Sequence, residues 1–180
     1  MRAASDATKI EQLMQGIGRL AKGPGRVYLV GGASAVTIGW RPTTVDADLK
    51  LDPEPEGVFD AIAKLKGELD MNVELAAPDD FIPPLPGWKE RSRFIARHGQ
   101  VDFFHYDFYA QALAKIERGH TMDLEDARQM TVRGLIDMVE LARRFDAIVP
   151  DIVRYPAIDP DAFRAKVEGF TGGMVHGSAG

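Results

Sequence analysis

Residues 45–51 alternate strictly between apolar and charged side chains, and this pattern restricts the fold more than any other feature of the chain. In the run Val-Asp-Ala-Asp-Leu-Lys-Leu, the apolar side chains fall on one face of an extended strand, and Asp46, Asp48 and Lys50 fall on the other. The run therefore predicts a half-buried strand that carries two carboxylates on the same side.

A glycine pair follows another predicted strand, earlier in the chain. The apolar segment 27–30 leads directly into Gly31, Gly32 and a short helix that ends near Ile38. Backbone N–H groups of such a turn can face a ligand, and the N-terminus of the following helix favours an anion such as phosphate. The hydroxyl of Ser34 would add one more donor. The turn is therefore a candidate phosphate cradle.

The two features are informative because they occur together and in this order. Alone, a glycine pair after a strand is commonly a tight turn, and alternate carboxylates on a strand are commonly a solvated face. Two carboxylates on one side repel each other in the absence of a cation, so Asp46 and Asp48 favour Mg²⁺ and its oxygen ligands. A phosphate cradle and a carboxylate pair are the minimum needed for metal-assisted phosphoryl or nucleotidyl transfer.

The remaining pattern predicts the α/β (α+β) class: a mixed sheet flanked by helices, followed by a helical C-terminal part. Further helices are expected over residues 7–20, 57–69, 108–118, 124–146 and 160–168, and further strands over 72–76, 91–97 and 100–106. We expect a core over residues 1–120 and a helical extension over 121–180 that packs on it as one compact unit. The glycine-rich residues 172–180 are expected to be loose.

Composition narrows the possible functions. The 180 residues suit one domain, and the absence of cysteine excludes a disulfide framework, a thiolate zinc site and a cysteine nucleophile. The formal net charge of -5 argues against strong nonspecific DNA binding. No apolar run approaches the roughly 18 residues that a membrane span requires, so we expect no membrane association and a cytoplasmic protein.

Two groups of charged residues have both a functional and a structural interpretation. Arg91, Arg93 and Arg97 are expected on one face of an edge strand, either as a phosphate or RNA contact or as charges that prevent edge-to-edge aggregation. Asp123 is expected to be a helix N-cap with Asp126 as its capping partner. Of these two acids, Asp126 is the better candidate to face a site.

The residues 31–35, Gly-Gly-Ala-Ser-Ala, together with 41–49, Arg-Pro-Thr-Thr-Val-Asp-Ala-Asp-Leu, resemble the signature of the minimal nucleotidyltransferases. The resemblance is greatest to the branch that includes the toxin-like AbiEii proteins. Residues 107–118, followed by Asp123-Leu-Glu-Asp126, are similar to the helical Lys…Arg…Asp-x-x-Asp element of that branch. Together the matching segments lie within residues 27–130.

This resemblance implies a nucleotidyltransferase-like fold and Mg²⁺-dependent transfer of a nucleoside monophosphate from an NTP to a hydroxyl. The acceptor would be a protein side chain, a tRNA end or a small molecule, and a toxin–antitoxin pair is one biological setting. Metal ions that bridge the triphosphate would be held by Asp46 and Asp48. The implied nucleotide-binding residues are Gly31, Gly32, Ser34, Thr44, Lys115 and Asp126.

A third carboxylate would complete a metal site or activate the acceptor hydroxyl, and two residues compete for this role. Glu74 follows one crossover helix, as the third acid does in the simplest members of the family. Asp102 lies among apolar residues on an expected central strand, just before the helix that carries Lys115, as in the AbiEii-like branch. We favour Asp102 as the third catalytic and metal-binding carboxylate.

Two other functional classes remain open. A degenerate module could bind nucleotide without transfer, because the Lys50 ammonium shares the face of Asp46 and Asp48 and could partly replace a metal ion. An interaction protein, such as the partner of a toxin in a small operon, would need an exposed apolar face on the helices after residue 124.

Overall fold

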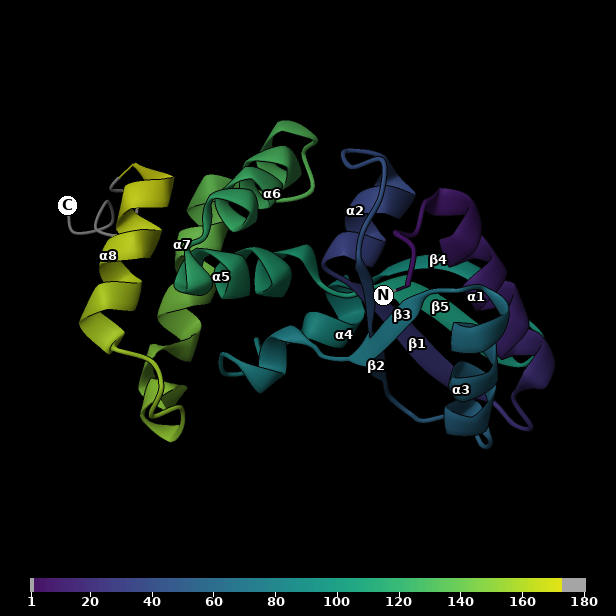
Figure 1. Cartoon of the computed structure of the whole chain (residues 1–180). Helices are drawn as coiled ribbons and strands as arrows, with labels where there is room; N and C mark the ends of the chain where they lie inside the picture. The colour runs from purple at the N-terminus through teal and green to yellow at the C-terminus, as the bar shows by residue number, and fades with distance from the viewer. Residues whose placement is uncertain (1, 173–180) are drawn as a thin grey trace. The chain divides into compact units, whose positions relative to one another are not determined.

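The computed structural model describes residues 2–172 and has the expected mixed α/β architecture (Figure 1). Within this range the chain forms two compact units. The first runs from the N-terminus to Ala77 and from Ser92 to Tyr106, and the second comprises Pro78–Arg91 and the chain from Asp107 onward. The expected division between residues 120 and 121 falls within the second unit, and residues 173–180 of the expected extension lie outside the described part.

A five-stranded mixed sheet in the order β3-β2-β1-β5-β4 forms the centre of the first unit. The central strand β1 pairs antiparallel with β2 and parallel with β5. The edge strand β3 is parallel to β2, and the edge strand β4 is antiparallel to β5. The strand bounds are Gly25–Val30 for β1, Asp46–Leu51 for β2, Asn72–Leu75 for β3, Arg93–His98 for β4 and Val101–His105 for β5.

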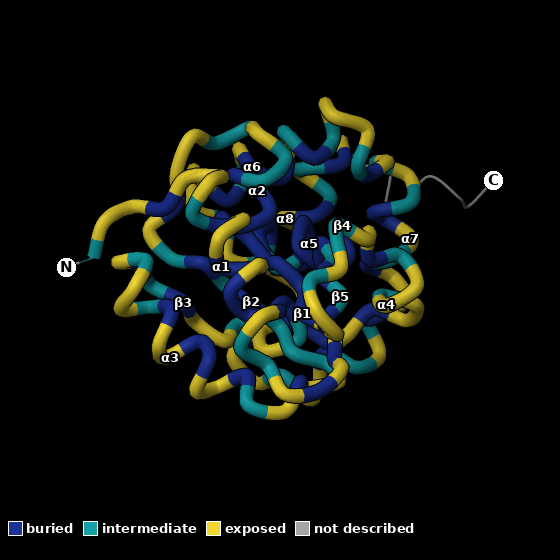
Figure 2. Tube along the Cα trace, turned by 90° about the vertical axis from the view of Figure 1, so that its right-hand side faces the viewer, coloured by how far each residue is buried: buried dark blue, intermediate teal, exposed yellow. Residues whose placement is uncertain are grey.

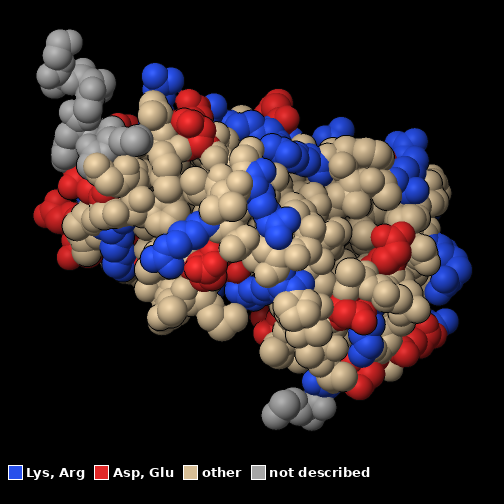
Figure 3. All heavy atoms as spheres, turned by 90° about the horizontal axis from the view of Figure 1, so that it is seen from above, with Lys and Arg blue, Asp and Glu red and all other residues tan. Residues whose placement is uncertain are grey.

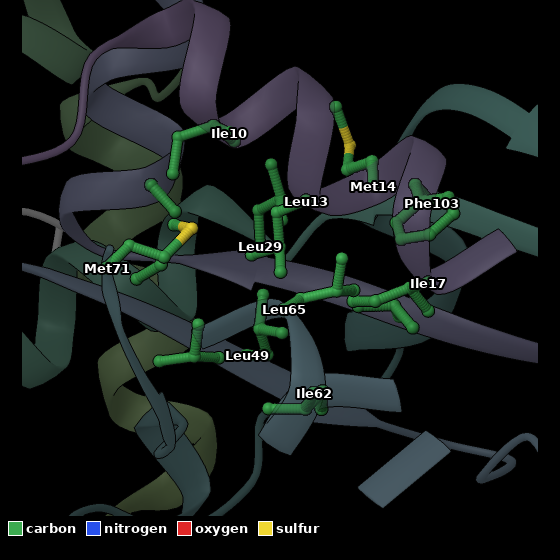
Figure 4. Packing of buried hydrophobic residues seen from close by; sticks show 14 of the residues in the cluster. Ile10, Leu13, Met14, Ile17, Leu29, Leu49, Ile62, Leu65, Met71 and Phe103 are labelled. Atoms are coloured by element: carbon green, nitrogen blue, oxygen red, sulfur yellow. The ribbon is translucent and has the colours of Figure 1, made fainter. Parts of the chain in front are cut away.

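Helices α1 (Ala7–Leu20) and α3 (Val58–Glu68) supply the apolar side chains that bury one face of this sheet. The stripe of α1 interdigitates with α3 and with the strands, as Figure 4 shows. Leu29 of β1 and Leu49 of β2 are almost completely buried beneath it, and β1 is buried along most of its length (Figure 2). The residues labelled in Figure 4 are Ile10, Leu13, Met14, Ile17, Leu29, Leu49, Ile62, Leu65, Met71 and Phe103.

The short helix α2 (Gly32–Ile38) follows β1 without a loop and adds Ala33 and Val36 to the same core. It ends at Gly39, which has a left-handed backbone with φ of 113°. Because its N-terminal residue is Gly32, the helix holds the glycine turn at the end of β1.

The second unit is helical. Its helices are α4 (Trp88–Arg91), α5 (Phe108–Arg118), α6 (Thr121–Val132), α7 (Met138–Ile148) and α8 (Pro160–Thr171), with short 3₁₀ turns η1 (Pro78–Asp80) and η2 (Val149–Arg154). Helix α5 packs against α6, α7 and α8. The rings of Phe145 and Phe163 pack edge to face with their centroids 4.9 Å apart. These contacts explain why α5 belongs to the helical unit although the sequence assigns it to the core.

Two expectations about this unit are wrong. The expected helix over 124–146 is two helices, because Gly134 takes a left-handed φ of 69° after α6 and Asp137 caps α7 by accepting from the Glu140 amide at 2.9 Å. Helix α6 begins earlier than expected, with His120 as its N-cap residue, so Asp123 lies in its first turn rather than at the cap.

Within the described residues, no helix is both long enough and apolar enough to cross a membrane. On the face of the protein seen in Figure 3, acidic and basic side chains lie interspersed.

Candidate functional site

The glycine turn lies directly against the second carboxylate of β2. Gly31 has a left-handed φ of 57°, and a Cβ atom added there would lie 3.4 Å from Oδ2 of Asp48. In the β1–β2 ladder Asp48 is opposite Val30, the residue that precedes the turn. The antiparallel pairing therefore brings together the two features that the sequence separates by a helix and a loop.

Gly32 makes a second contact of the same kind. A Cβ atom at Gly32 would lie 2.0 Å from Oγ1 of Thr44, so only glycine fits here. The Thr44 hydroxyl donates to the Asp46 carbonyl at 2.9 Å, and its backbone exchanges hydrogen bonds with Ser5. Thr44 thus connects the turn to the beginning of β2. Its buried hydroxyl holds the loop that precedes the carboxylate pair.

Asp46 and Asp48 lie on the face of β2 that points away from the main core. Both are half-buried, whereas Ala47 and Leu49 between and beside them are buried in the core. Their Cα atoms are separated by two residues of strand, about 7 Å, so one cation or one cation pair can contact both carboxylates. The predicted alternation is confirmed from Asp46 to Leu51, whereas Val45, expected on the buried face, precedes the strand and is exposed.

The strand registers separate the two candidates for a third carboxylate. Glu74 of β3 is directly opposite Asp48, and residues opposite one another present their side chains to the same face. Asp102 of β5 is opposite Arg26, four positions before Val30 in β1, which is about 13 Å of strand length. The structure therefore brings Glu74 to the carboxylate pair and does not bring Asp102 there.

Asp102 has a different partner. Its carboxylate accepts from Nε and NH2 of Arg97 on the neighbouring strand β4, at 2.7 and 3.0 Å. These hydrogen bonds lower the pKa of Asp102 and raise that of Arg97. The bidentate pair gives Asp102 a structural partner on β4, and its expected role as the third catalytic and metal-binding carboxylate stays a prediction.

No group of three or more His, Asp or Glu side chains in the described part of the chain lies close enough to hold a metal ion. A magnesium site here would therefore consist of two carboxylates and be completed by other oxygens. This is an ordinary arrangement, because Mg²⁺ is commonly bound through one or two carboxylates together with substrate phosphates and water.

The Ser34 side chain points into the protein. It is fully buried, and its hydroxyl donates to the Leu29 carbonyl at 3.0 Å. The Nδ1 atom of His105, at the end of β5, lies 3.0 Å from the same hydroxyl oxygen. The expected role of this hydroxyl as a phosphate donor stays a prediction, and the bonds that it makes here hold α2 to the ends of β1 and β5.

His105 was not singled out by sequence reasoning. It has no partner at metal-ligand spacing, and its alternation with apolar neighbours is typical of any strand. Burial, with a smaller contribution from Arg93, lowers the pKa of His105 to about 4. The ring is therefore neutral at physiological pH.

Lys115 and Asp126 lie in the second unit and form a buried ion pair, with Nζ 2.8 Å from Oδ2. The neighbouring Asp123 accepts from Nε of Arg118 at 2.7 Å. Burial alone would raise the pKa of Asp123, but Arg118 and the more distant Lys115 outweigh it, and the pKa is lowered. These pairs join α5 to α6, and the nucleotide-binding roles of Lys115 and Asp126 stay predictions.

The expected row of three arginines on one strand face is wrong. Arg91 belongs to helix α4, and its NH2 atom donates to the Asp107 carboxylate at 2.7 Å. A register shift between Phe94 and Ala96 then places Arg93 opposite His105 and Arg97 opposite Asp102, on different faces of the sheet. A bulge of this kind leaves no signature in the alternation of a short edge strand.

A comparison with protein families found one matching model, described as "Nucleotidyltransferase of unknown function (DUF6036)", over residues 8–158. The match covers well over half of the chain. It includes the glycine turn, the carboxylate pair, both candidates for the third carboxylate, and the α5–α6 ion pairs. Comparisons with curated proteins and with solved structures found no match.

Proposed function

This chain belongs to the DUF6036 family of nucleotidyltransferases of unknown function, and from that premise we propose that it transfers a nucleoside monophosphate from an NTP to a hydroxyl group with the help of Mg²⁺. One observation carries the proposal: the Gly31 turn lies against the Asp48 carboxylate. A triphosphate in the turn would be next to the carboxylate pair, where a bound cation could contact both.

The carboxylate pair has the chemistry that Mg²⁺ requires. Asp46 and Asp48 offer hard oxygen ligands on one face, and a third acid, Glu74, is in register with Asp48. Glu74 is exposed, so its carboxylate can be reached by solvent and by an acceptor. When bound, Mg²⁺ would neutralise charge on the triphosphate and on the leaving pyrophosphate.

The roles of the protein groups follow from their placement. The backbone N–H groups of the Gly31–Gly32 turn would bind phosphate oxygens, as such groups do in other turns that bind anions. Glu74 would accept the proton of the acceptor hydroxyl. The hydroxyl oxygen forms a bond to the α-phosphorus while the bond from that phosphorus to the bridging oxygen breaks, and pyrophosphate leaves.

By analogy with the AbiEii-like branch, which the sequence resembles, the proposal extends to a cytoplasmic toxin that modifies a protein or a tRNA. Incubation of the protein with α-labelled NTP and separated protein and RNA fractions of a cell extract would identify the acceptor class. Label that stays in the free nucleotide in both fractions would contradict this part of the proposal.

A second candidate function is nucleotide binding without transfer. The specific observation is Lys50, which follows Asp48 on the same face of β2 and lies opposite Tyr28. An ammonium group beside two carboxylates lowers their affinity for a metal cation, because it neutralises part of their charge. If Lys50 serves this purpose, Lys50→Ala raises the affinity for Mg²⁺, and an unchanged Mg²⁺ titration excludes it.

Calorimetric titration with each NTP, with and without Mg²⁺, tests the proposed function. We expect Mg²⁺-dependent binding in the wild type and its loss in Asp46→Asn and in Asp48→Asn. Thermal stability should be equal or slightly higher in both variants, because each removes a repulsive charge.

The matched control is Asp60→Asn, which removes an exposed carboxylate from the first turn of α3 in the same unit and should leave the binding of NTP and Mg²⁺ unchanged. Binding that persists in both strand variants without Mg²⁺ would favour the second candidate. A strand variant that melts well below wild type would identify its carboxylate as structural.

A further inference from the structure

His105, Ser34 and Leu29 form a chain of hydrogen bonds beneath the glycine turn. The Ser34 hydroxyl donates to the Leu29 carbonyl, and His105 Nδ1 contacts the same hydroxyl, with both distances 3.0 Å. We propose that His105 is a positioning residue that fixes the Gly31–Gly32 turn through Ser34. The inference rests on the proposed function, since the turn is the part of that site expected to bind phosphate.

The direction of the bonds follows from what each group can offer. A serine hydroxyl has one proton, and the Leu29 carbonyl can only accept. The network is complete when the neutral ring of His105 carries its proton on Nδ1 and donates it to Ser34 Oγ. The Nδ1 proton, the serine hydroxyl and the Leu29 carbonyl then each have a partner, so the ring orientation and the serine rotamer determine each other.

The three residues belong to three elements that meet at the turn. Leu29 lies two positions before Gly31 in β1, Ser34 lies in the first turn of α2, and His105 lies opposite Leu29 at the end of β5. The Leu29 carbonyl also accepts from the Tyr106 amide at 2.9 Å. The chain on both sides of the glycines is thereby tied to β5.

Such an anchor matters most where the backbone itself is free to move. Glycine populates many conformations, so a turn of two glycines keeps its N–H groups in one direction only if the flanking residues hold it. Both His105 and Ser34 are buried, at 8% and 0% exposure, and the one proton of the Ser34 hydroxyl is donated to the Leu29 carbonyl. Their contribution to binding is therefore preorganisation, not contact.

The experiment compares four variants by the Kd for an NTP with Mg²⁺ and by hydrogen exchange in the nucleotide-free protein. His105→Leu and Ser34→Ala should each raise Kd about tenfold, and the double variant should be no worse than either alone. His105→Asn keeps an amide donor near the position of Nδ1 and should stay within about twofold of wild type. Amides of residues 29–36 should exchange faster in His105→Leu.

Thr37→Val is the matched control, because the Thr37 hydroxyl donates within α2, to the Ala33 carbonyl at 2.7 Å, and does not contact β5. It should change neither Kd nor the exchange of the turn. If His105→Leu lowers thermal stability but leaves Kd and the exchange of residues 29–36 at wild-type values, His105 is only structural and the proposal is wrong.

The exchange measurement separates this proposal from the proposed function. If the wild-type protein binds no NTP, the proposed function fails. Faster exchange of residues 29–36 in His105→Leu, but not in Thr37→Val, would still support the anchoring of the turn. Unchanged exchange would overturn it.

Discussion

Single residues decide how closely the two motifs approach each other. Gly31 and Gly32 are required for different reasons, since Gly31 has a left-handed backbone beside Asp48 and Gly32 leaves the space that Thr44 occupies. Neither reason can be read from the sequence alone, which indicates a turn but not its neighbours. These contacts show that the candidate phosphate-binding turn lies beside one particular carboxylate, that of Asp48.

At this scale, Gly31→Ala should lower both stability and NTP binding. A Cβ atom in the left-handed region costs about 1–2 kcal/mol, and this one would also be in van der Waals contact with Oδ2 of Asp48, at 3.4 Å. Chemical denaturation measures the first effect and calorimetric titration the second. Gly39→Ala separates the effect on stability from the effect on binding. Gly39 also has a positive φ, of 113°, but a Cβ atom there meets nothing within 4 Å. This variant should therefore lose stability without weaker NTP binding. Equal binding by the two variants would show that the Gly31 contact is irrelevant.

The pairing of elements determines which acidic residues can act together. The sequence locates strands around Glu74 and Asp102 correctly, yet it cannot say which lies beside Asp48. That depends on the order β3-β2-β1-β5-β4 and on the register of each pair. Because strand order and register arise from contacts between residues far apart in the chain, the sequence alone leaves the choice between Glu74 and Asp102 open.

Two helix glycines of the first unit, Gly18 in α1 and Gly67 in α3, should respond to alanine with opposite changes in the free energy of unfolding. A Cβ at Gly18 would lie 2.4 Å from the backbone carbonyl oxygen of His98, so Gly18→Ala should destabilise the protein by about 1–3 kcal/mol. A Cβ at Gly67, in α3, meets nothing within 4 Å, so Gly67→Ala should stabilise it by about 0.5–1 kcal/mol through helix propensity. Urea unfolding of both variants measures the free energy of unfolding of each one relative to wild type. A Gly18→Ala variant that is as stable as wild type, or more stable, would mean that helix α1 does not approach the β4–β5 hairpin this closely.

At the scale of the whole molecule, buried and paired charges make stability depend on pH. The pKa of His105 is 6.5 in an ordinary environment and about 4 in the folded protein. Between these values the unfolded chain binds a proton that the folded protein does not, so stability falls as the pH falls, by up to about 3 kcal/mol. Asp102 and Asp123 have lowered pKa values, so their contribution is lost only as the pH falls below about 3.8.

Denaturant unfolding from neutral pH down to about 4.5 isolates the His105 effect, since both carboxyl groups remain ionised there. His105→Asn should flatten the loss of stability over this range. Thr37→Val, which removes no titratable group, should leave the slope at its wild-type value. Parallel curves for wild type and His105→Asn would contradict the assigned pKa.

The sequence by itself determined what is local and periodic. The alternation correctly predicted the two faces of β2 from Asp46 to Leu51, the stripe over 7–20 predicted α1, and the glycine pair predicted the turn after β1. These features need only the repeat of a helix or strand and the backbone preferences of a few residues, all of which are encoded by neighbours in the chain.

Only the tertiary structure decided which of these elements meet. It placed Glu74 rather than Asp102 opposite Asp48, turned the Ser34 hydroxyl toward Leu29 and His105, and assigned α5 to the helical unit. Each of these outcomes depends on strand register, on a bulge or on the packing of residues distant in sequence. Such contacts form only when the apolar faces of all the elements are buried together, so no local pattern can encode them.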